Sequence, residues 1–228
     1  MPDTASHSGR RRRGRPPRDH AGPPTSTVIL EHATRLFAEH GHEGVSMRAI
    51  AEAVGIDVSS VHHHYPTKAQ LYDACFRCVF EAERDHLEPS VEALGDAART
   101  GSAADFLAAM HQLVEAFVEF LEDRPSTTFL WLRRWLDPAQ QEPLDAAYSL
   151  PIYHRVEQAL IDACTRGLVA EPTPHITVRS LVWAAHGHVT ARVASGPHTT
   201  AAAAREGREF RAFAHRFVDR LYAPDEGR

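Results

Sequence analysis

The chain has 228 residues, of which 43% are hydrophobic and 24% charged, and this balance is typical of a soluble globular protein. Its three cysteines are too few for a disulfide scaffold, and no apolar stretch approaches the roughly 18 residues that a membrane span needs. No apolar segment follows the basic N-terminus as in a secretory signal peptide, so we expect a cytoplasmic, nucleoid-associated protein without a membrane partner.

The formal charge of -5 is distributed unevenly along the chain. Residues 1–24 carry six arginines and two aspartates, whereas residues 25–72 and 73–228 are both net acidic. A basic end on an acidic body suits a protein in which one end meets phosphate. We predict three segments with these boundaries: a basic arm, a DNA-binding domain, and an effector-binding and dimerisation domain.

Residues 1–24 form the predicted arm, which has too few apolar side chains for a core and should be disordered when free. Its stretch RRRRGRPPR, residues 10–18, resembles an AT-hook, which lies in a narrow A·T-rich minor groove. Arg11, Arg13 and Arg15 are the candidate DNA contacts there. A solvated tail that only adds non-specific phosphate affinity is the other interpretation.

From Thr25 the apolar residues recur with a helical period until Gly41, which ends the first predicted helix. Ser46 has the type and position of an N-cap for a second helix, over residues 47–54, and Gly55 makes the turn that follows. Asp57 then caps a third helix. A short helix, a glycine turn and another short helix make the helix-turn-helix layout, whose second helix enters the major groove.

The third helix should bury one stripe and expose the side chains that read DNA. Val58, Val61 and Tyr65 are the expected stripe. The outward candidates have hydrogen-bonding groups suited to base edges and phosphates: Ser59, Ser60, His62 and His63. Thr67 and Gln70 form a capping-box pattern that opens a fourth helix, where Lys68 can hold a phosphate.

Three stretches within residues 29–71 resemble the DNA-binding domain of the tetracycline-repressor (TetR) family: LFAEHG at 36–41, SMRAIAEAVG at 46–55 and HHYPTK at 63–68. The resemblance covers about a fifth of the chain and implies nine or ten helices. It also implies that Ser46 and Lys68 contact phosphate, and we add Arg48 and Tyr65 to the DNA-binding candidates. The chain departs from the family pattern at three positions, so the operator cannot be inferred by analogy. These positions are Asp57, Ser59 and His62.

Residues 73–228 show further helical patterns and no strand pattern, so we predict an all-α fold with an antiparallel helical second domain. Helical stripes cover residues 106–121, 129–136, 151–167, 174–195 and 202–222. The resemblance implies that 151–167 and 174–195 pair in a homodimer. Small residues there permit close approach, although packing within one chain explains them equally well: Ala159, Ala163, Ala185 and Gly187.

An apolar, aromatic-rich cavity between such helices is the default site for a small molecule. The candidate lining residues are Phe117, Trp131, Trp135, Trp183 and His186. Aromatic side chains at helical spacing are more often core than ligand contacts. Tryptophans beside Arg133 or Arg134 suggest a planar, partly polar or anionic ligand.

Two other patterns were weighed for chemistry. Consecutive helical residues point about 100° apart, so His62, His63 and His64 cannot converge on one metal ion. Cys75 and Cys78 have redox-motif spacing but lie in a helical pattern, which favours buried thiols over a redox switch. We therefore expect no metal, no cofactor and no enzyme activity.

Together these patterns predict a regulator that binds a palindromic double-stranded DNA operator as a dimer and is released by a small-molecule effector. Repression is the expected sign of regulation. An effector-independent DNA-binding protein is the alternative, and a metal-dependent helical enzyme is a remote one.

Overall fold

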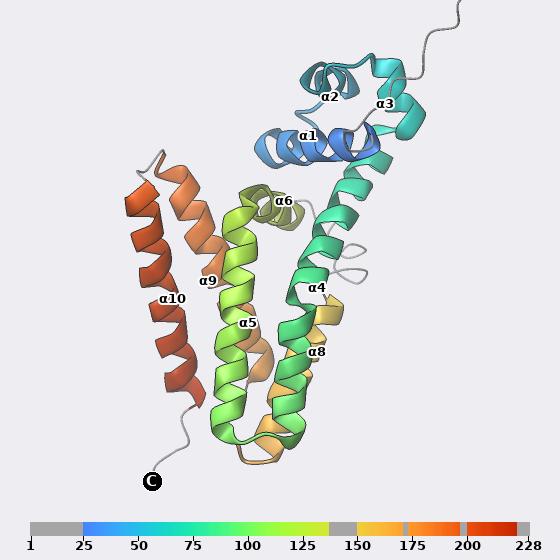
Figure 1. The fold of residues 1–228 in the computed structure, drawn as a ribbon. Helices are drawn as coiled ribbons and strands as arrows, with labels where there is room; N and C mark the ends of the chain where they lie inside the picture. The colour runs from blue at the N-terminus through green and yellow to red at the C-terminus, as the bar shows by residue number, and fades with distance from the viewer. Residues whose placement is uncertain (1–24, 137–149, 171–172, 197–199, 223–228) are drawn as a thin grey trace, which may run out of the picture.

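The computed structural model describes residues 25–136, 150–170, 173–196 and 200–222, and within them all regular structure is helical (Figure 1). The described helices are α1 Thr25–His40, α2 Met47–Val54, α3 Val58–His64, α4 Lys68–Thr100, α5 Ala103–Asp123, α6 Pro125–Leu136, α8 Leu150–Thr165, α9 Pro174–Ala194 and α10 Thr200–Tyr222. The all-α prediction is confirmed. No described helix is long and apolar enough to cross a membrane.

Helices α1, α2 and α3 form a compact unit at one end of the molecule (Figure 1). Helix α4 begins in this unit and continues through the body for 33 residues. The boundary expected at residue 72 therefore lies inside a continuous helix, and no linker separates the two parts.

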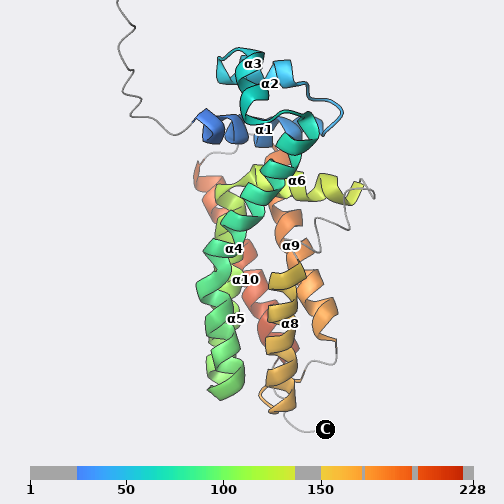
Figure 2. The same ribbon diagram turned by 90° about the vertical axis from the view of Figure 1, so that its right-hand side faces the viewer.

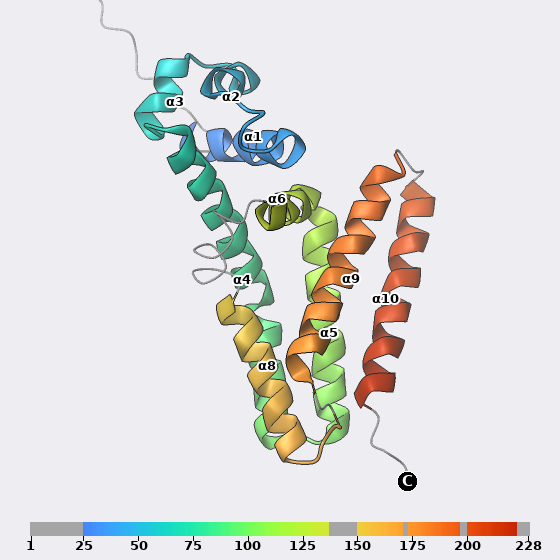
Figure 3. The same ribbon diagram turned by 180° about the vertical axis from the view of Figure 1, so that it is seen from behind.

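The body is a helical bundle in which α5 returns beside α4 and α10 packs along α5 (Figures 1 and 3). Helix α8 lies against α4, and α9 contacts α8, α5 and α6. Helix α6 crosses the bundle beneath α1 (Figure 2). It is the part of the body, besides α4, that packs extensively against the unit formed by α1, α2 and α3.

Local capping explains where several helices begin. At the start of α5, Ser102 Oγ accepts from the Asp105 amide at 3.2 Å, while the Asp105 carboxylate accepts from the Ser102 amide at 2.8 Å. This reciprocal pair satisfies two of the amides that a helix N-terminus leaves free. The hydrogen bonds also lower the pKa of Asp105 below its ordinary value.

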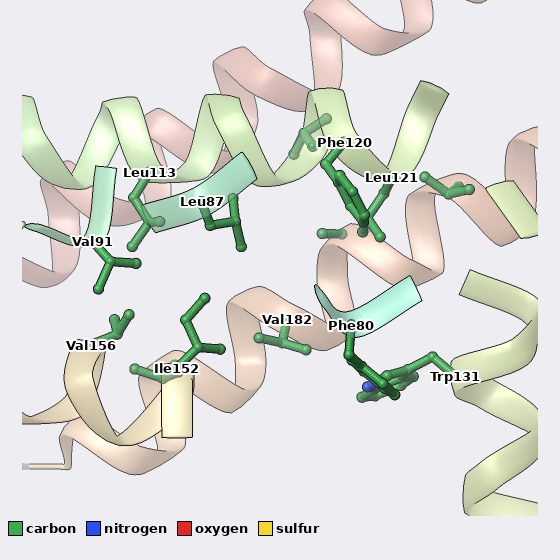
Figure 4. Packing of buried hydrophobic residues seen from close by; sticks show 14 of the residues in the cluster. Phe80, Leu87, Val91, Leu113, Phe120, Leu121, Trp131, Ile152, Val156 and Val182 are labelled. Carbon is green, nitrogen blue, oxygen red and sulfur yellow. The ribbon is translucent and has the colours of Figure 1, made fainter. Parts of the chain in front are cut away.

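A single hydrophobic core runs from the unit of α1, α2 and α3 into the body. In the bundle it is built from α4, α5, α6, α8, α9 and α10, and Figure 4 shows part of it. Its side chains include Phe80, Leu87, Val91, Leu113, Phe120, Leu121, Trp131, Ile152, Val156 and Val182. The predicted body helices are confirmed, and most of their predicted ends lie within two residues of the described ends.

Candidate nucleic-acid interface and effector cavity

The turn between α2 and α3 is fixed by the residues expected there. Ser46 is the N-cap of α2, and its side chain accepts from the Ala49 amide at 3.1 Å. Gly55 has φ of 78°, in the left-handed region, and its amide donates to the carbonyl of Ala51 at 2.9 Å. A side chain at this φ would be strained, so glycine sets the angle between the two helices.

Helix α3 is held by fewer apolar contacts than its sequence predicts. Val61 is fully buried, but Val58 is 40% exposed, so its predicted burial is wrong. Val58 is the first residue of a helix of only seven residues, and its side chain lies beyond the reach of the core. Asp57 stands at the N-cap as expected, yet its carboxylate makes no capping hydrogen bond.

The outward face of α3 brings Ser59, Ser60 and His63 together. They line a shallow hollow of about 380 Å³, with Thr25, Ile56 and His64 at its edges. Ser59 and His63 are exposed. His62 is directed away, because its Nδ1 donates to the carbonyl of Pro66 at 3.0 Å.

The other candidates for DNA contact surround this face and already have protein partners. Lys68 Nζ donates to the carbonyl of His42 at 2.9 Å, which ties the start of α4 to the loop after α1. Arg48 forms an exposed ion pair with Glu52 at 3.0 Å. Tyr65 is half-buried, and burial raises the pKa of its hydroxyl.

Two groups of predicted residues cannot be placed. Arg11, Arg13 and Arg15 lie outside the described residues, and so does the side chain of Trp135. The arm and this part of the pocket remain predictions.

A partly open cavity of about 60 Å³ lies between α4, α5, α8 and α9. In Figure 4, Leu87, Val91 and Leu113 face Ile152, Val156 and Val182 across this space. The remaining lining residues are Met110, Val114, Phe117, Tyr153, Val178 and Leu181. Of the described candidates for a ligand pocket, Phe117 lines this cavity.

The other described pocket candidates form an aromatic cluster next to the cavity. His186 is 1% exposed and stacks on Trp131, with ring centroids 4.1 Å apart and an interplanar angle of 12°. Phe117 meets the edge of His186 at 5.7 Å, and Trp183 packs on the other side of Trp131 at 4.9 Å. His186 Nδ1 also lies 3.1 Å from Thr128 Oγ1 in α6. The cluster therefore joins α5, α6 and α9.

Arg133 in α6 holds the end of α1. Its guanidinium donates to the carbonyls of Ala38 at 3.1 Å and Glu39 at 2.6 Å. Gly41 follows with φ of 73°, and a Cβ there would come within 3.1 Å of the guanidinium. A cation at a helix C-terminus also stabilises the helix dipole. The sequence suggested Arg133 as a ligand contact, but its donors serve α1 instead.

A second polar cluster, which sequence reasoning missed, joins α5, α9 and α10 through Glu122. This carboxylate accepts from His188 at 3.0 Å, from Arg192 at 2.7 Å and from Arg211 at 2.6 Å. Burial alone would raise the pKa of Glu122, but the hydrogen bonds from Arg211 and His188 outweigh it and lower the pKa. The cluster consists of four polar residues on three helices. Because these residues are far apart in the sequence, no local pattern predicts that they meet.

The cysteines lie in α4 as expected and carry free thiols. Cys75 is buried, and burial raises the pKa of its thiol to about 12. Cys78 is exposed, so its predicted burial is wrong, because it lies on the outer side of α4; partial desolvation still raises the pKa of its thiol. Because the thiolate is the reactive form, both shifts lower reactivity at neutral pH.

Comparison with known proteins agrees with this architecture. Residues 29–75 match the family model for bacterial regulatory proteins of the tetR family. The transcriptional repressor AcnR of Corynebacterium efficiens is 45% identical over 49 residues, which are 22% of this chain and 26% of that repressor. The match therefore spans about a quarter of the length of this curated relative.

Solved structures are similar over most of the chain. A Clostridium perfringens protein assigned as a fatty acid metabolism regulator has a TM-score of 0.68 at 13% identity, covering 88% of this chain and 100% of that one. A ketosteroid transcriptional regulator of Mycobacterium tuberculosis has a TM-score of 0.64 at 18% identity, covering 85% and 94%. The class is thus a helix-turn-helix carried on an all-helical body. Residues 29–75 are thus similar to the DNA-binding segment of tetR-family proteins, and the fold over most of the chain is similar to that of these solved structures.

Proposed function

We propose that the protein is a transcription repressor that binds operator DNA as a homodimer and is released by a small molecule. The observation that carries the proposal is the outward face of α3, where Ser59, Ser60 and His63 gather on a helix fixed by Ser46 and Gly55. Short hydroxyl and imidazole side chains in this setting can bond to base edges and phosphate oxygens. A cavity in the body supports the effector part of the proposal.

On DNA, α3 enters the major groove and the surrounding groups hold the backbone. The amides at the start of α2, next to Ser46, and the ammonium of Lys68 are suited to phosphate. A dimer places two copies of α3 in successive grooves about 34–36 Å apart, so the operator is palindromic.

The test uses duplex DNA from the promoters that flank the protein's own gene. The variant Ser59→Ala/His63→Ala should bind the footprinted site at least tenfold more weakly, because two base-reading side chains are lost. His175→Ala, an exposed histidine of α9, is the matched control and should bind as the wild type does. Equal affinity of the double variant would contradict the assignment of α3.

The arm contributes attraction to DNA in this proposal. The DNA-binding unit itself is net acidic, whereas residues 1–24 contain six arginines. Deleting residues 1–24 should weaken binding and flatten the dependence of affinity on salt, because fewer counterions are released. Unchanged affinity and salt slope would show that the arm does not touch DNA.

Effector binding would act on the geometry of the dimer. A ligand that prefers a conformation in which the two α3 helices no longer match the groove spacing releases DNA by population shift. An effector-independent DNA-binding protein is the competing function. It predicts tight binding to the operator that no cavity ligand reduces.

A further inference from the structure

The cavity between α4, α5, α8 and α9 has a lining without charge. All twelve of its described lining residues have apolar or aromatic side chains, and Tyr153 supplies the one side-chain oxygen. A charged ligand group buried among them would lose its hydration without gaining a partner of opposite charge. The adjacent charged residues Glu88 of α4 and Arg155 of α8 pair with each other at 2.8 Å, and the buried Glu83 of α4 is not among the lining residues.

The cavity is also too small for most ligands as it stands. Its volume of about 60 Å³ is well below the ~150 Å³ of an engineered apolar cavity that accepts benzene. A ligand of that size can be buried fully only if part of the wall is displaced.

One part of the wall has room to move. Val114, Phe117 and Leu181 line the cavity on one side and a groove of about 240 Å³ between α5, α9 and α10 on the other. Phe117 has the largest of these side chains and is half-buried. Turning its ring into the groove enlarges the cavity without moving a helix.

Displacement of Phe117 would be felt at α6. The Phe117 ring packs edge-on against His186 at 5.7 Å, and His186 stacks on Trp131 of α6 at 4.1 Å. Trp131 stands two residues before Arg133, which holds the end of α1. Withdrawing the phenyl ring removes one neighbour from this stack.

We propose that the cavity binds an uncharged, apolar molecule, and that binding displaces Phe117 into the groove between α5, α9 and α10. The inference rests on the proposed effector-controlled function and adds to it the chemical class of the ligand and the side chain that responds.

Calorimetry on the full chain tests the ligand class with 1-butanol, 1-hexanol and 1-octanol, and with hexanoate and hexyltrimethylammonium as charged molecules of matched length. Affinity should rise about fourfold per methylene along the alcohols, as burial of apolar surface predicts. Both charged molecules should bind at least tenfold more weakly than 1-hexanol. Equal or tighter binding of either one would overturn the proposal.

Variants at Val182 place the binding in the cavity. Val182→Phe fills the space and should weaken the binding of 1-octanol at least tenfold. Val182→Leu is the second variant, for use if phenylalanine impairs folding, and should weaken the binding to a smaller extent. Val193→Phe, at an exposed valine of the same helix, is the matched control and should change nothing. If both Val182 variants bound 1-octanol as tightly as the wild type, the assignment of the cavity as the binding site would be contradicted.

The role of Phe117 has its own readout in tryptophan emission. In the wild type, 1-octanol should change the emission as the surroundings of the Trp131 stack change. Phe117→Leu retains apolar bulk but lacks the ring, so its octanol affinity should stay within threefold while the emission change is lost. An undiminished emission change would exclude Phe117 as the responding residue.

The two hypotheses fail separately. If alkanols bind but leave operator DNA bound, the proposed effector control is wrong and the apolar site stands. If another compound releases DNA while no alkanol binds, the apolar ligand class is wrong and the regulatory function stands.

Discussion

Three side chains proposed to meet DNA already have protein partners. Arg48 pairs with Glu52, His62 donates to the carbonyl of Pro66, and Lys68 donates to the carbonyl of His42. The exposed Arg48 pair is easily exchanged for a phosphate, because surface ion pairs contribute about 0–1 kcal/mol. Lys68 is more constrained, because its ammonium is held by the carbonyl of His42 in the loop after α1, and any phosphate contact would start from that position. Ser59 and His63 are the exposed groups of α3 best placed to read bases.

At the same scale, Glu122→Gln tests the charge cluster of the body. Because Glu122 is 14% exposed and contacts three basic side chains, loss of its charge should cost about 2 kcal/mol of unfolding free energy at pH 7. Its pKa lies below the ordinary 4.5, so this stabilisation is complete above that pH and is lost as pH falls through the folded-state pKa. Wild type and variant should therefore converge under acid in chemical denaturation.

Glu119→Gln is the matched control, since Glu119 lies on the same helix with an exposed side chain. It should change the unfolding free energy by less than about 0.5 kcal/mol. A difference between Glu122→Gln and wild type that does not shrink as the pH falls below 4.5 would contradict the assignment of the charge as the stabilising feature.

At the scale of elements, α6 connects the helical body to α1 through the two hydrogen bonds of Arg133. Arg133→Ala should lower the unfolding free energy by about 1–2 kcal/mol and speed amide exchange at the end of α1 more than in α2. Arg133→Lys keeps the charge but not the paired donors, and should recover part of the protection.

Arg179→Ala provides the comparison for that experiment, because Arg179 is exposed on α9. Its exchange pattern should match the wild type. If Arg133→Ala left the end of α1 as protected as in the wild type, the guanidinium would not be what holds it.

The sequence predicted elements well wherever the signal is local. The cap at Ser46, the left-handed glycines and the apolar period of α1 act within a few residues, so they could be read in order. Contacts between residues far apart in the chain could not be predicted from the sequence. The bonds of Arg133 to α1 span some 95 positions, and the cavity is shaped by four helices whose packing no single period encodes.

The same distinction explains the candidate site. The outward side chains of α3 could be predicted because a helix of known register has a known outer face. Val58 was predicted wrongly because burial at a helix end depends on neighbours elsewhere in the chain. The aromatic residues chosen for the pocket do come together, but mostly as packing beside the cavity. The aliphatic residues that line the cavity could not be predicted, because in a sequence they have the same helical spacing as ordinary core residues.

At the scale of the whole molecule, the proposed dimer should use the exposed side of α9. The sequence suggested small residues for this contact, but Ala159, Ala163 and Ala185 are buried within one chain. Trp183 is 40% exposed, with Ile161 of α8 and Phe213 of α10 exposed on neighbouring helices. Apolar side chains of this size on a surface favour an interface.

Sedimentation velocity of Trp183→Asp should show a monomer, with Trp183→Phe as the conservative variant that stays dimeric. Comparing Ile161→Asp in α8 with Phe213→Asp in α10 then identifies which of these two helices joins α9 in the interface. Only the substitution of a residue within the interface should weaken the dimer. A dimer that survives all three charged variants would place the interface elsewhere.

Helix α4 gives this architecture a mechanical property. From Leu87, which lines the cavity, to Lys68, next to α3, it is a single rod of about 29 Å at 1.5 Å per residue. A tilt of about 5° at the cavity therefore moves the far end by about 2.5 Å. In a dimer, the tilt of α4 in each protomer would change the distance between the two α3 helices. Two displacements of about 2.5 Å would change this distance by up to about 5 Å, which is a mismatch against a groove repeat of about 34 Å.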